Sequence, residues 1–322
     1  MPLVRKILKW AFRGFVVIGL ILAIALFAFR TPDTDPKTMV AKYSSPDSQF
    51  LDTGDARIHY RDQGPKDAPV LLLVHGGNGS LHTWEKLIDA LDDRYRLISF
   101  DMPGHGLTGP SKSRDYSASA MTKAATQVLD ATGVKNATWV GNSLGGWIVW
   151  RAALDVPDRV NAIVLLDASG AQGVQPIKPY LGARLSQSWL GRLVMPHVTP
   201  ESIIRSSLTQ TVADSEQVTD AVVKRYWELL RYPGNRKAAG DRSLVDREAD
   251  KWNEIGSLKM PVLLIWGKQD RVIPVAHGEA FAKAIKGSSL IIIEKAGHLP
   301  MEEQPSEVAK AIDVWMSKPK TP

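Results

Sequence analysis

Residues 137–146, ATWVGNSLGG, decide how this sequence is interpreted. The apolar run Ala137–Val140 is typical of a strand, and a helical pattern of apolar residues follows over Leu144–Leu154. Between them, Ser143 lies in the pattern G-x-S-x-G, which needs a strand, a sharp turn and a helix in that order. Glycines on both sides allow the backbone to bend without a Cβ clash. The motif therefore predicts that Ser143 is a nucleophile exposed at a strand-to-helix turn.

Short apolar runs alternate with helical periodicity on both sides of this motif. The predicted strands are Arg57–Arg61, Val70–Val74, Arg96–Phe100, Ala137–Val140, Ala162–Leu166, Val262–Trp266 and Leu290–Ile293. The predicted helices include Thr83–Leu91, Ala118–Thr132, Leu144–Leu154, Gly278–Ile285 and Ser306–Trp315. Strands that alternate with helices favour an α/β fold, in which a mostly parallel sheet has helices on both faces. The alternation stops over residues 170–255, where helical candidates such as Asp220–Leu230 predict a helical insertion.

Other polar residues follow predicted strands in the same way. Asp270 and His298 each come shortly after a strand, as Ser143 does. Because the carboxyl ends of parallel strands meet at one edge of a sheet, we expect these three side chains to form a catalytic triad. The turn HGGNG follows another strand, and such a turn can direct backbone N–H groups into a site. We expect the amides of Gly77 and Leu144 to form the oxyanion hole.

The sequence leaves two interpretations for the acid of the triad and for Asn142. Asp167 follows the predicted strand Ala162–Leu166 and competes with Asp270 as the acid of the triad, although the setting of Asp270 favours it. Asn142 is either a turn residue or a weak candidate for contact with the substrate. Asp101, in the turn FDMPGHG, is expected to organise that turn rather than to catalyse.

The motifs VLLLVHGGNGS, SFDMPGHG, WVGNSLGG, LLIWGKQDRVIP and EKAGHLPMEEQP together resemble the α/β-hydrolase superfamily, over about residues 50–317. This resemblance implies an eight-stranded, mostly parallel sheet, a helical cap after the sixth strand, and a triad at Ser143, Asp270 and His298. The motifs look most like bacterial esterases and lipases with a GNSMGG-type turn. They also look like hydrolases that cleave carbon–carbon bonds in aromatic meta-cleavage products. Those enzymes typically carry Trp after the catalytic His, where this chain has Leu299.

The resemblance implies a serine hydrolase that cleaves carboxylic esters through an acyl-enzyme, with no metal and no organic cofactor. The expected partner is a small-molecule or lipid-derived acyl substrate. A carbon–carbon hydrolase and a cofactor-free perhydrolase share every motif and stay open as alternatives. A catalytically inactive ligand-binding protein of the same fold is a further alternative, although every triad and oxyanion position is occupied by a suitable residue.

The N-terminal sequence predicts a membrane segment. From Gly14 to Phe29 every residue is apolar or Gly, and a helix from Trp10 to Phe29 would be about 30 Å long, which matches the thickness of a bilayer core. Four basic residues precede the run, which predicts a single-pass anchor with the N-terminus in the cytoplasm and the catalytic part outside it. The alternative is a signal peptide cleaved near Ala23–Ala25, which would give a secreted protein.

Charge and composition set further limits. The net charge is +6, but residues 1–42 hold seven Lys and Arg against two Asp, which leaves only +1 for the rest. A nucleic-acid partner is therefore not expected. The chain has no cysteine, so thiolate chemistry is excluded, and nothing in the sequence specifies an oligomeric state. The predicted organisation is an anchor over residues 1–30, a linker over 31–50, an α/β core over 51–169 and 256–322, and a cap over 170–255.

Overall fold

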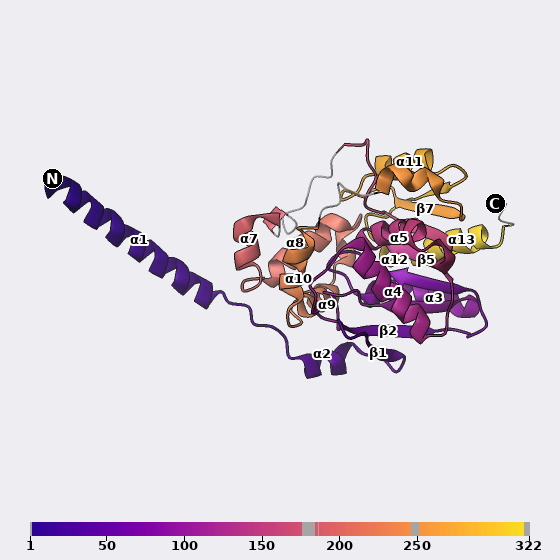
Figure 1. The fold of residues 1–322 in the computed structure, drawn as a ribbon, viewed down its shortest axis with the longest axis horizontal. Helices are drawn as coiled ribbons and strands as arrows, with labels where there is room; N and C mark the ends of the chain where they lie inside the picture. Colours follow the sequence, from indigo (N-terminus) through magenta and orange to yellow (C-terminus); the bar gives the residue numbers. More distant parts are fainter. Residues whose placement is uncertain (1, 176–183, 186, 246–250, 319–322) are drawn as a thin grey trace.

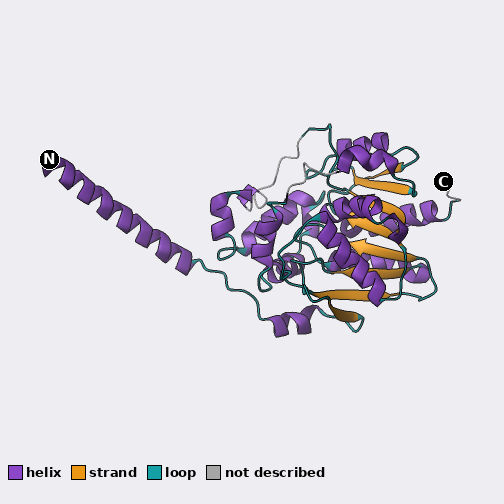
Figure 2. Cartoon of the chain, viewed as in Figure 1, coloured by secondary structure: helices purple, strands orange, loops and turns teal. Residues whose placement is uncertain are grey.

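The structure, a computed structural model, describes residues 2–175, 184–185, 187–245 and 251–318. Figure 2 shows a central sheet with helices on both of its faces. A separate group of helices lies at one side of the sheet, and helix α1 (Pro2–Ala28) extends away from the rest of the chain (Figure 1).

Eight strands form one sheet in the order β1-β2-β4-β3-β5-β6-β7-β8. Their bounds are β1 Ser48–Asp52, β2 Arg57–Gln63, β3 Val70–Val74, β4 Arg96–Phe100, β5 Ala137–Asn142, β6 Val160–Leu166, β7 Val262–Gly267 and β8 Ser289–Ile293. Strand β2 pairs antiparallel with β1 and β4, and the other neighbouring strands are parallel. The expectation of an eight-stranded, mostly parallel sheet is confirmed. The carboxyl ends of β3 and β5–β8 therefore share one edge.

Helices cover the sheet on two sides because its side chains alternate between two cores. On one side lie α3 (Glu85–Leu91), α12 (Pro300–Glu303) and α13 (Pro305–Met316), and on the other lie α4 (Ala118–Ala131), α5 (Leu144–Asp155) and α11 (Val275–Ala284). In β3, Leu71 and Leu73 pack in the core with α3 and α13, whereas Leu72 and Val74 pack with α4 and α5. The continuous apolar strand VLLLV is thus explained by burial on both faces.

The helical insertion lies between β6 and β7, as predicted. Its helices are α7 (Trp189–Val194), α8 (Glu201–Thr211), α9 (Asp220–Leu230) and α10 (Asn235–Arg242). Short 3₁₀ helices cover Leu81–Trp84, Asp92–Arg94, Pro157–Arg159, Ser215–Gln217 and Lys251–Ser257. No strand occurs in the parts of residues 170–255 that the structure describes. We refer to this insertion as the cap.

The predicted linker over residues 31–50 is more ordered than the sequence suggested. It contains a helix, α2 (Pro36–Tyr43), and the first residues of β1. Asp35 begins α2 by accepting hydrogen bonds from the backbone N–H and the hydroxyl of Thr38, both at 2.7 Å. The edge strand β1 was missed because its sequence, SQFLD, has little apolar alternation and is specified by pairing with β2.

Helix α1 covers the apolar run for which a membrane span was predicted. Several of its large side chains are exposed, among them Phe12 (69%), Phe15 (76%) and Phe27 (80%). Among the residues that the structure describes, no helix is both long enough and apolar enough to cross a membrane. The predicted transmembrane helix is therefore not confirmed by the structure, and anchoring stays a proposal.

Asp101 connects the end of β4 to two loops at the edge of the sheet. Its Oδ2 accepts hydrogen bonds from Nδ1 of His59 and from the backbone N–H of Leu107, and its Oδ1 accepts one from Leu81, all at 2.8 Å. Burial acts to raise the pKa of Asp101, but the hydrogen bond from His59 and the electrostatic interactions with His59, His75 and His82 together outweigh burial and hold the pKa well below its usual value. The interpretation of Asp101 as the residue that organises its turn is confirmed.

We predict that Asp101→Asn destabilises the fold by about 2–4 kcal/mol at neutral pH, because an amide cannot accept all three hydrogen bonds. A lowered pKa contributes stability that is present above the unfolded value and lost as the pH falls. Wild type should therefore lose more stability than the variant between about pH 5 and about pH 3. Denaturant unfolding at several pH values measures both effects.

The matched control is Asp52→Asn, because Asp52 is exposed and accepts one local hydrogen bond from Gly54. We expect it to change stability by no more than about 0.5 kcal/mol. If Asp101→Asn behaves like this control, then Asp101 does not hold the two loops.

Candidate active site

Ser143 occupies a strained turn between β5 and α5. Its backbone lies at φ +54° and ψ −117°, a conformation that costs a residue with a side chain roughly 1–3 kcal/mol. The turn is possible because the chain passes very close to its neighbours. A Cβ on Gly145 would lie 2.0 Å from the carbonyl oxygen of Val74, and a Cβ on Gly141 would lie 2.5 Å from that of Gly145. A larger residue at either flanking position would thus clash with a backbone carbonyl, so both glycines are required, as the motif predicted.

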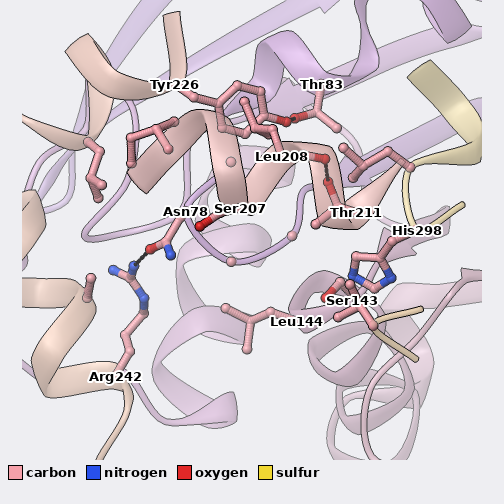
Figure 3. A pocket seen from close by; sticks show the side chains of 18 of the residues that line it. Asn78, Thr83, Ser143, Leu144, Ser207, Leu208, Thr211, Tyr226, Arg242 and His298 are labelled. Atoms are coloured by element: carbon pink, nitrogen blue, oxygen red, sulfur yellow. Dashed lines mark hydrogen bonds between the residues drawn. The ribbon is translucent and has the colours of Figure 1, made fainter. Parts of the chain in front are cut away.

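His298 and Asp270 form a hydrogen-bonded pair at the same edge of the sheet. The Nδ1–H of His298 donates to Oδ2 of Asp270 at 2.8 Å. The other oxygen of Asp270 accepts from the backbone N–H groups of Val272 (2.7 Å) and Ile273 (2.9 Å), so the carboxylate is fixed on both sides. Figure 3 shows the His298 imidazole beside the Ser143 side chain. This leaves Nε2 as the imidazole nitrogen available to a nucleophile.

The backbone around His298 is held from two directions. Its N–H donates to the carbonyl of Thr211 at the end of cap helix α8, at 2.6 Å. The buried carboxylate of Glu303 accepts from the amides on both sides of His298, at 2.9 and 3.2 Å, and from the amide of Ala213 in the cap at 2.7 Å. Burial raises the pKa of Glu303. Glu303 was missed by sequence reasoning because its partners are all backbone groups.

Asp167, the rival acid, lies beside the pair but does not replace Asp270. It is fully buried, has φ +45°, and its Oδ1 accepts a hydrogen bond from the amide of Gly267 at 2.9 Å. One carboxylate oxygen of Asp167, one of Asp270 and one ring nitrogen of His298 lie within 4.8 Å of one another. Burial, and then the charge of Asp270, raise the pKa of Asp167 well above its usual value. Asp167 therefore holds its proton to a higher pH than an exposed aspartate does.

The same three groups are close enough to be considered as metal ligands. A metal bound by all three would compete with the hydrogen bond that His298 donates to Asp270. The donor set therefore fits a triad better than a metal centre.

The two predicted oxyanion donors lie beside Ser143. The turn at Gly76 and Gly77 packs against the serine turn, because a Cβ on Gly76 would lie 2.9 Å from Oδ1 of Asn142 and one on Gly77 would lie 3.8 Å from the Leu144 side chain. Gly77 and Leu144 line the same cavity as Ser143. In the described part of the chain neither backbone N–H donates a hydrogen bond. Their assignment stays a prediction that this placement favours.

Asn142 connects the serine turn to the histidine loop. It is fully buried, and its Nδ2 donates to the carbonyls of Leu166 (3.2 Å) and His298 (3.0 Å). It also borders the cavity. Contact with the substrate stays a prediction, while the hydrogen bonds indicate a role in positioning.

A cavity of about 310 Å³ lies above Ser143, between the core and the cap. Its aliphatic lining comes largely from the cap, with Met195, Ile203, Ile204, Leu208 and Leu230. Among the cap aromatics in the described residues, Tyr226 lines the cavity, while Trp189 is exposed. Tyr180 lies outside the described residues. The apolar part of the cavity wall is thus built mainly from aliphatic side chains rather than aromatic ones.

Polar residues at the cavity wall connect the cap to the core (Figure 3). Arg242 of α10 donates to the carbonyl of Gly104 at 2.8 Å and to Oδ1 of Asn78 at 3.0 Å. The hydroxyl of Tyr226 in α9 donates to Glu302 at 2.8 Å. Burial, and then the charge of Glu302, raise the pKa of Tyr226. Sequence reasoning missed these pairs because their members lie far apart along the chain.

We predict that Asp167→Asn folds and keeps activity within about threefold of wild type, because an amide can still accept from Gly267 and donate toward Asp270. Asp167→Ala should lose about 2–3 kcal/mol of stability, since it leaves the Gly267 amide without a partner. A raised pKa contributes stability at low pH that is lost as the pH rises, so wild type should lose stability above about pH 4 and Asp167→Asn should not. Melting temperatures across this range test the assignment, and equal pH slopes for wild type and Asp167→Asn contradict it.

The chain is similar in sequence to a known family and to several known proteins. A family model described as alpha/beta hydrolase fold matches residues 69–305. The uncharacterized hydrolase YugF of Bacillus subtilis is 28% identical over 255 residues, which cover 79% of this chain and 91% of that protein. A 2-hydroxy-6-oxononadienedioate/2-hydroxy-6-oxononatrienedioate hydrolase of a Pseudomonas species is 28% identical over 267 residues, covering 78% and 90%.

Solved structures give the same picture. The crystal structure of a hydrolase from Pseudomonas aeruginosa superposes with a TM-score of 0.71 at 25% sequence identity. The match covers 85% of this chain and 100% of that one. The shared architecture thus extends over most of this chain.

Proposed function

The chain belongs to the alpha/beta hydrolase fold family, and from this premise we propose that it is a serine hydrolase that cleaves carboxylic esters through an acyl-enzyme intermediate. The observation that carries the proposal is the Asp270–His298 pair, hydrogen-bonded at 2.8 Å and lying beside Ser143 in its strained turn. Nucleophile, base and orienting acid are the three roles that acyl transfer by a serine requires.

The first half of the reaction forms the acyl-enzyme. As Oγ of Ser143 attacks the carbonyl carbon of the ester, its proton passes to Nε2 of His298. Asp270 holds the imidazole in the tautomer that accepts this proton and stabilises the imidazolium that forms. The new C–O bond moves the carbonyl electron pair onto oxygen, where the amides of Gly77 and Leu144 can donate hydrogen bonds to it.

The second half releases both products. When the tetrahedral intermediate collapses, the bond to the alcohol breaks and His298 donates its proton to the leaving oxygen. Water then attacks the acyl carbon while His298 takes a proton from it, and the second collapse returns the proton to Ser143. No step needs a metal or an organic cofactor.

The shape and lining of the cavity support the proposal that the acyl group of the ester determines specificity. The cavity volume of about 310 Å³ is that of a small-molecule site, and the cap contributes an aliphatic part of its wall, which includes Ile203, Ile204 and Leu208. An apolar wall can bury the hydrocarbon part of an ester while the carbonyl lies at Ser143. Chain length should therefore affect the rate strongly.

We predict that Ser143→Ala lowers the hydrolysis of p-nitrophenyl esters, tested from acetate to palmitate, by at least about 10,000-fold. Labelling by a fluorophosphonate probe should disappear in the same variant. Ser207→Ala is the matched control, because Ser207 lines the same cavity but donates its hydroxyl to the carbonyl of Ile203. It should keep most activity and all labelling. Ester turnover that survives in Ser143→Ala refutes the proposal.

A carbon–carbon hydrolase is the second candidate. The Pseudomonas relative is named a 2-hydroxy-6-oxononadienedioate/2-hydroxy-6-oxononatrienedioate hydrolase. Arg242, which is bonded to Gly104 and Asn78, brings positive charge to the cavity wall, and this charge suits an acidic substrate of that kind. Leu299 at the position after His298 counts against this candidate, because such enzymes typically carry Trp there. Probe labelling of Ser143 without turnover of any ester would favour it, and would equally favour a perhydrolase.

We also propose that the protein is anchored in a membrane by its N-terminal helix, with the N-terminus in the cytoplasm and the catalytic part outside. The exposed apolar side chains of α1 and the four basic residues that precede its apolar run support this proposal. Cleavage of this segment as a signal peptide is the alternative. A lipid-derived substrate would suit an anchored enzyme.

We predict that the full chain stays in the membrane fraction after carbonate washing and that a variant without residues 2–30 does not. A reporter fused to the C-terminus should be active outside the cytoplasm. N-terminal sequencing of the mature protein separates an anchor from a cleaved signal. Release of the full chain by carbonate argues against anchoring.

A further inference from the structure

Cap helix α7 presents an apolar face to solvent. Trp189 is 70% exposed, Leu190 54% and Leu193 62%. Leu193 lies three residues after Leu190 and four residues after Trp189, so the three side chains share one side of the helix. Gly191, on the other side, is buried, since a Cβ there would meet the carbonyl oxygen of Leu185. The exposed face, which we call the α7 patch, consists of Trp189, Leu190 and Leu193.

The α7 patch lies beside the point where the chain leaves α1. The backbone N–H of Thr31 donates to the carbonyl of His197 at 2.7 Å, and the N–H of Thr199 donates to the Thr31 hydroxyl at 3.2 Å. Arg236 of the cap donates to the carbonyl of Thr31 at 2.8 Å. The end of α1 is therefore tied to the residues that follow α7. Figure 1 shows α7 on the side of the folded part that faces α1, away from α13.

Charge around the patch favours an anionic surface. The described residues 184–185 and 187–200, which include α7, contain two Arg and no Asp or Glu. Arg184, just before α7, is exposed, and so is Arg30 at the end of α1. A short helix that presents Trp and Leu among basic residues is typical of an element that lies in the interface of an anionic bilayer.

Residues on both sides of the α7 patch line the cavity at Ser143. Gln187 before α7, and Met195 and Thr199 after it, all line the cavity above Ser143. An element in contact with lipid at this place would bring the cavity to the membrane surface.

We propose that the α7 patch docks on the membrane into which α1 is inserted, and that this contact lets ester lipids pass from the bilayer into the cavity. The proposal rests on the membrane anchor and the ester hydrolase proposed above. It commits to an anionic lipid surface as the partner, because the tie between Thr31 and the cap places the patch next to the anchor. A second copy of the chain on the same patch is an outcome that the test separates.

The absence of cysteine from the sequence allows a site-specific test in the full chain. Leu190→Cys places one label on the patch, and Val314→Cys places one on α13, where Val314 is 49% exposed on the far side. Each variant carries an environment-sensitive fluorophore and is reconstituted in vesicles of phosphatidylcholine and phosphatidylglycerol. Quenching by iodide in the water and by brominated lipid in the bilayer then locates each label.

We expect the label at position 190 to be at least about threefold less accessible to iodide than the label at 314, and to be quenched by brominated lipid. Flotation of the vesicles is measured on the same samples. A chain that does not float overturns the anchor and with it this proposal. A chain that floats while both labels are equally accessible overturns the proposal for the patch alone. Protection at 190 that persists in detergent and rises with protein concentration identifies a second copy as the occupant, and also overturns it.

A second measurement tests delivery of the substrate. The triple variant Trp189→Ser, Leu190→Ser, Leu193→Ser is compared with Val314→Ser on p-nitrophenyl acetate in water and on p-nitrophenyl palmitate dissolved in the vesicles. We expect the triple variant to keep acetate hydrolysis and to lose palmitate hydrolysis by about threefold or more, with no change in Val314→Ser. An unchanged ratio of the two activities overturns delivery through the patch. Failure of wild type on both esters instead counts against the proposed ester hydrolase.

Discussion

The close approach of the β5–α5 turn to strand β3 is the constraint on which the site depends. Gly145 lies so near the carbonyl oxygen of Val74 that no larger residue fits, and this contact fixes where α5 begins. Ser143 is thereby held at φ +54°, with its amide bonded to the carbonyl of Leu166 at 3.0 Å. A nucleophile on a relaxed turn would sample other positions, whereas this one is fixed by the packing of three neighbouring strands. The strain is maintained by burial of the surrounding sheet.

Hydrogen bonds join the cap to the loop that carries His298. Thr211 at the end of α8 accepts a hydrogen bond from the amide of His298, and Glu303 bridges the histidine loop and Ala213. A displacement of this part of the cap would change the position of the imidazole. The polar bonds of Tyr226 and Arg242 tie other cap helices to the core. The cap therefore shapes the cavity beside Ser143 and also helps to hold His298 in place.

Local patterns in the sequence were sufficient where local chemistry determines structure. Strands β3 and β4 and helix α9 lie at their predicted bounds, because apolar runs and helical periodicity define them. The meeting of Ser143, Asp270 and His298 was predictable from three strand ends and the rule that these share an edge. Strand β1 was missed because its pairing with β2 specifies it. Helix α2 was missed although Asp35 and Thr38 define its first turn locally. The pair of Asn78 and Arg242 was missed because only the folded chain brings the two together, and Glu303 was missed because it accepts hydrogen bonds only from backbone N–H groups.

The central claim is that Ser143 carries the acyl group during turnover. Enzyme quenched with acid during steady-state hydrolysis of a p-nitrophenyl ester, then digested and analysed by mass spectrometry, tests it most directly. We expect one added acyl group on the peptide that contains Ser143, formed together with a burst of p-nitrophenol equal in amount to the enzyme. Turnover without an acylated peptide, or an acyl group on any other residue, would contradict it.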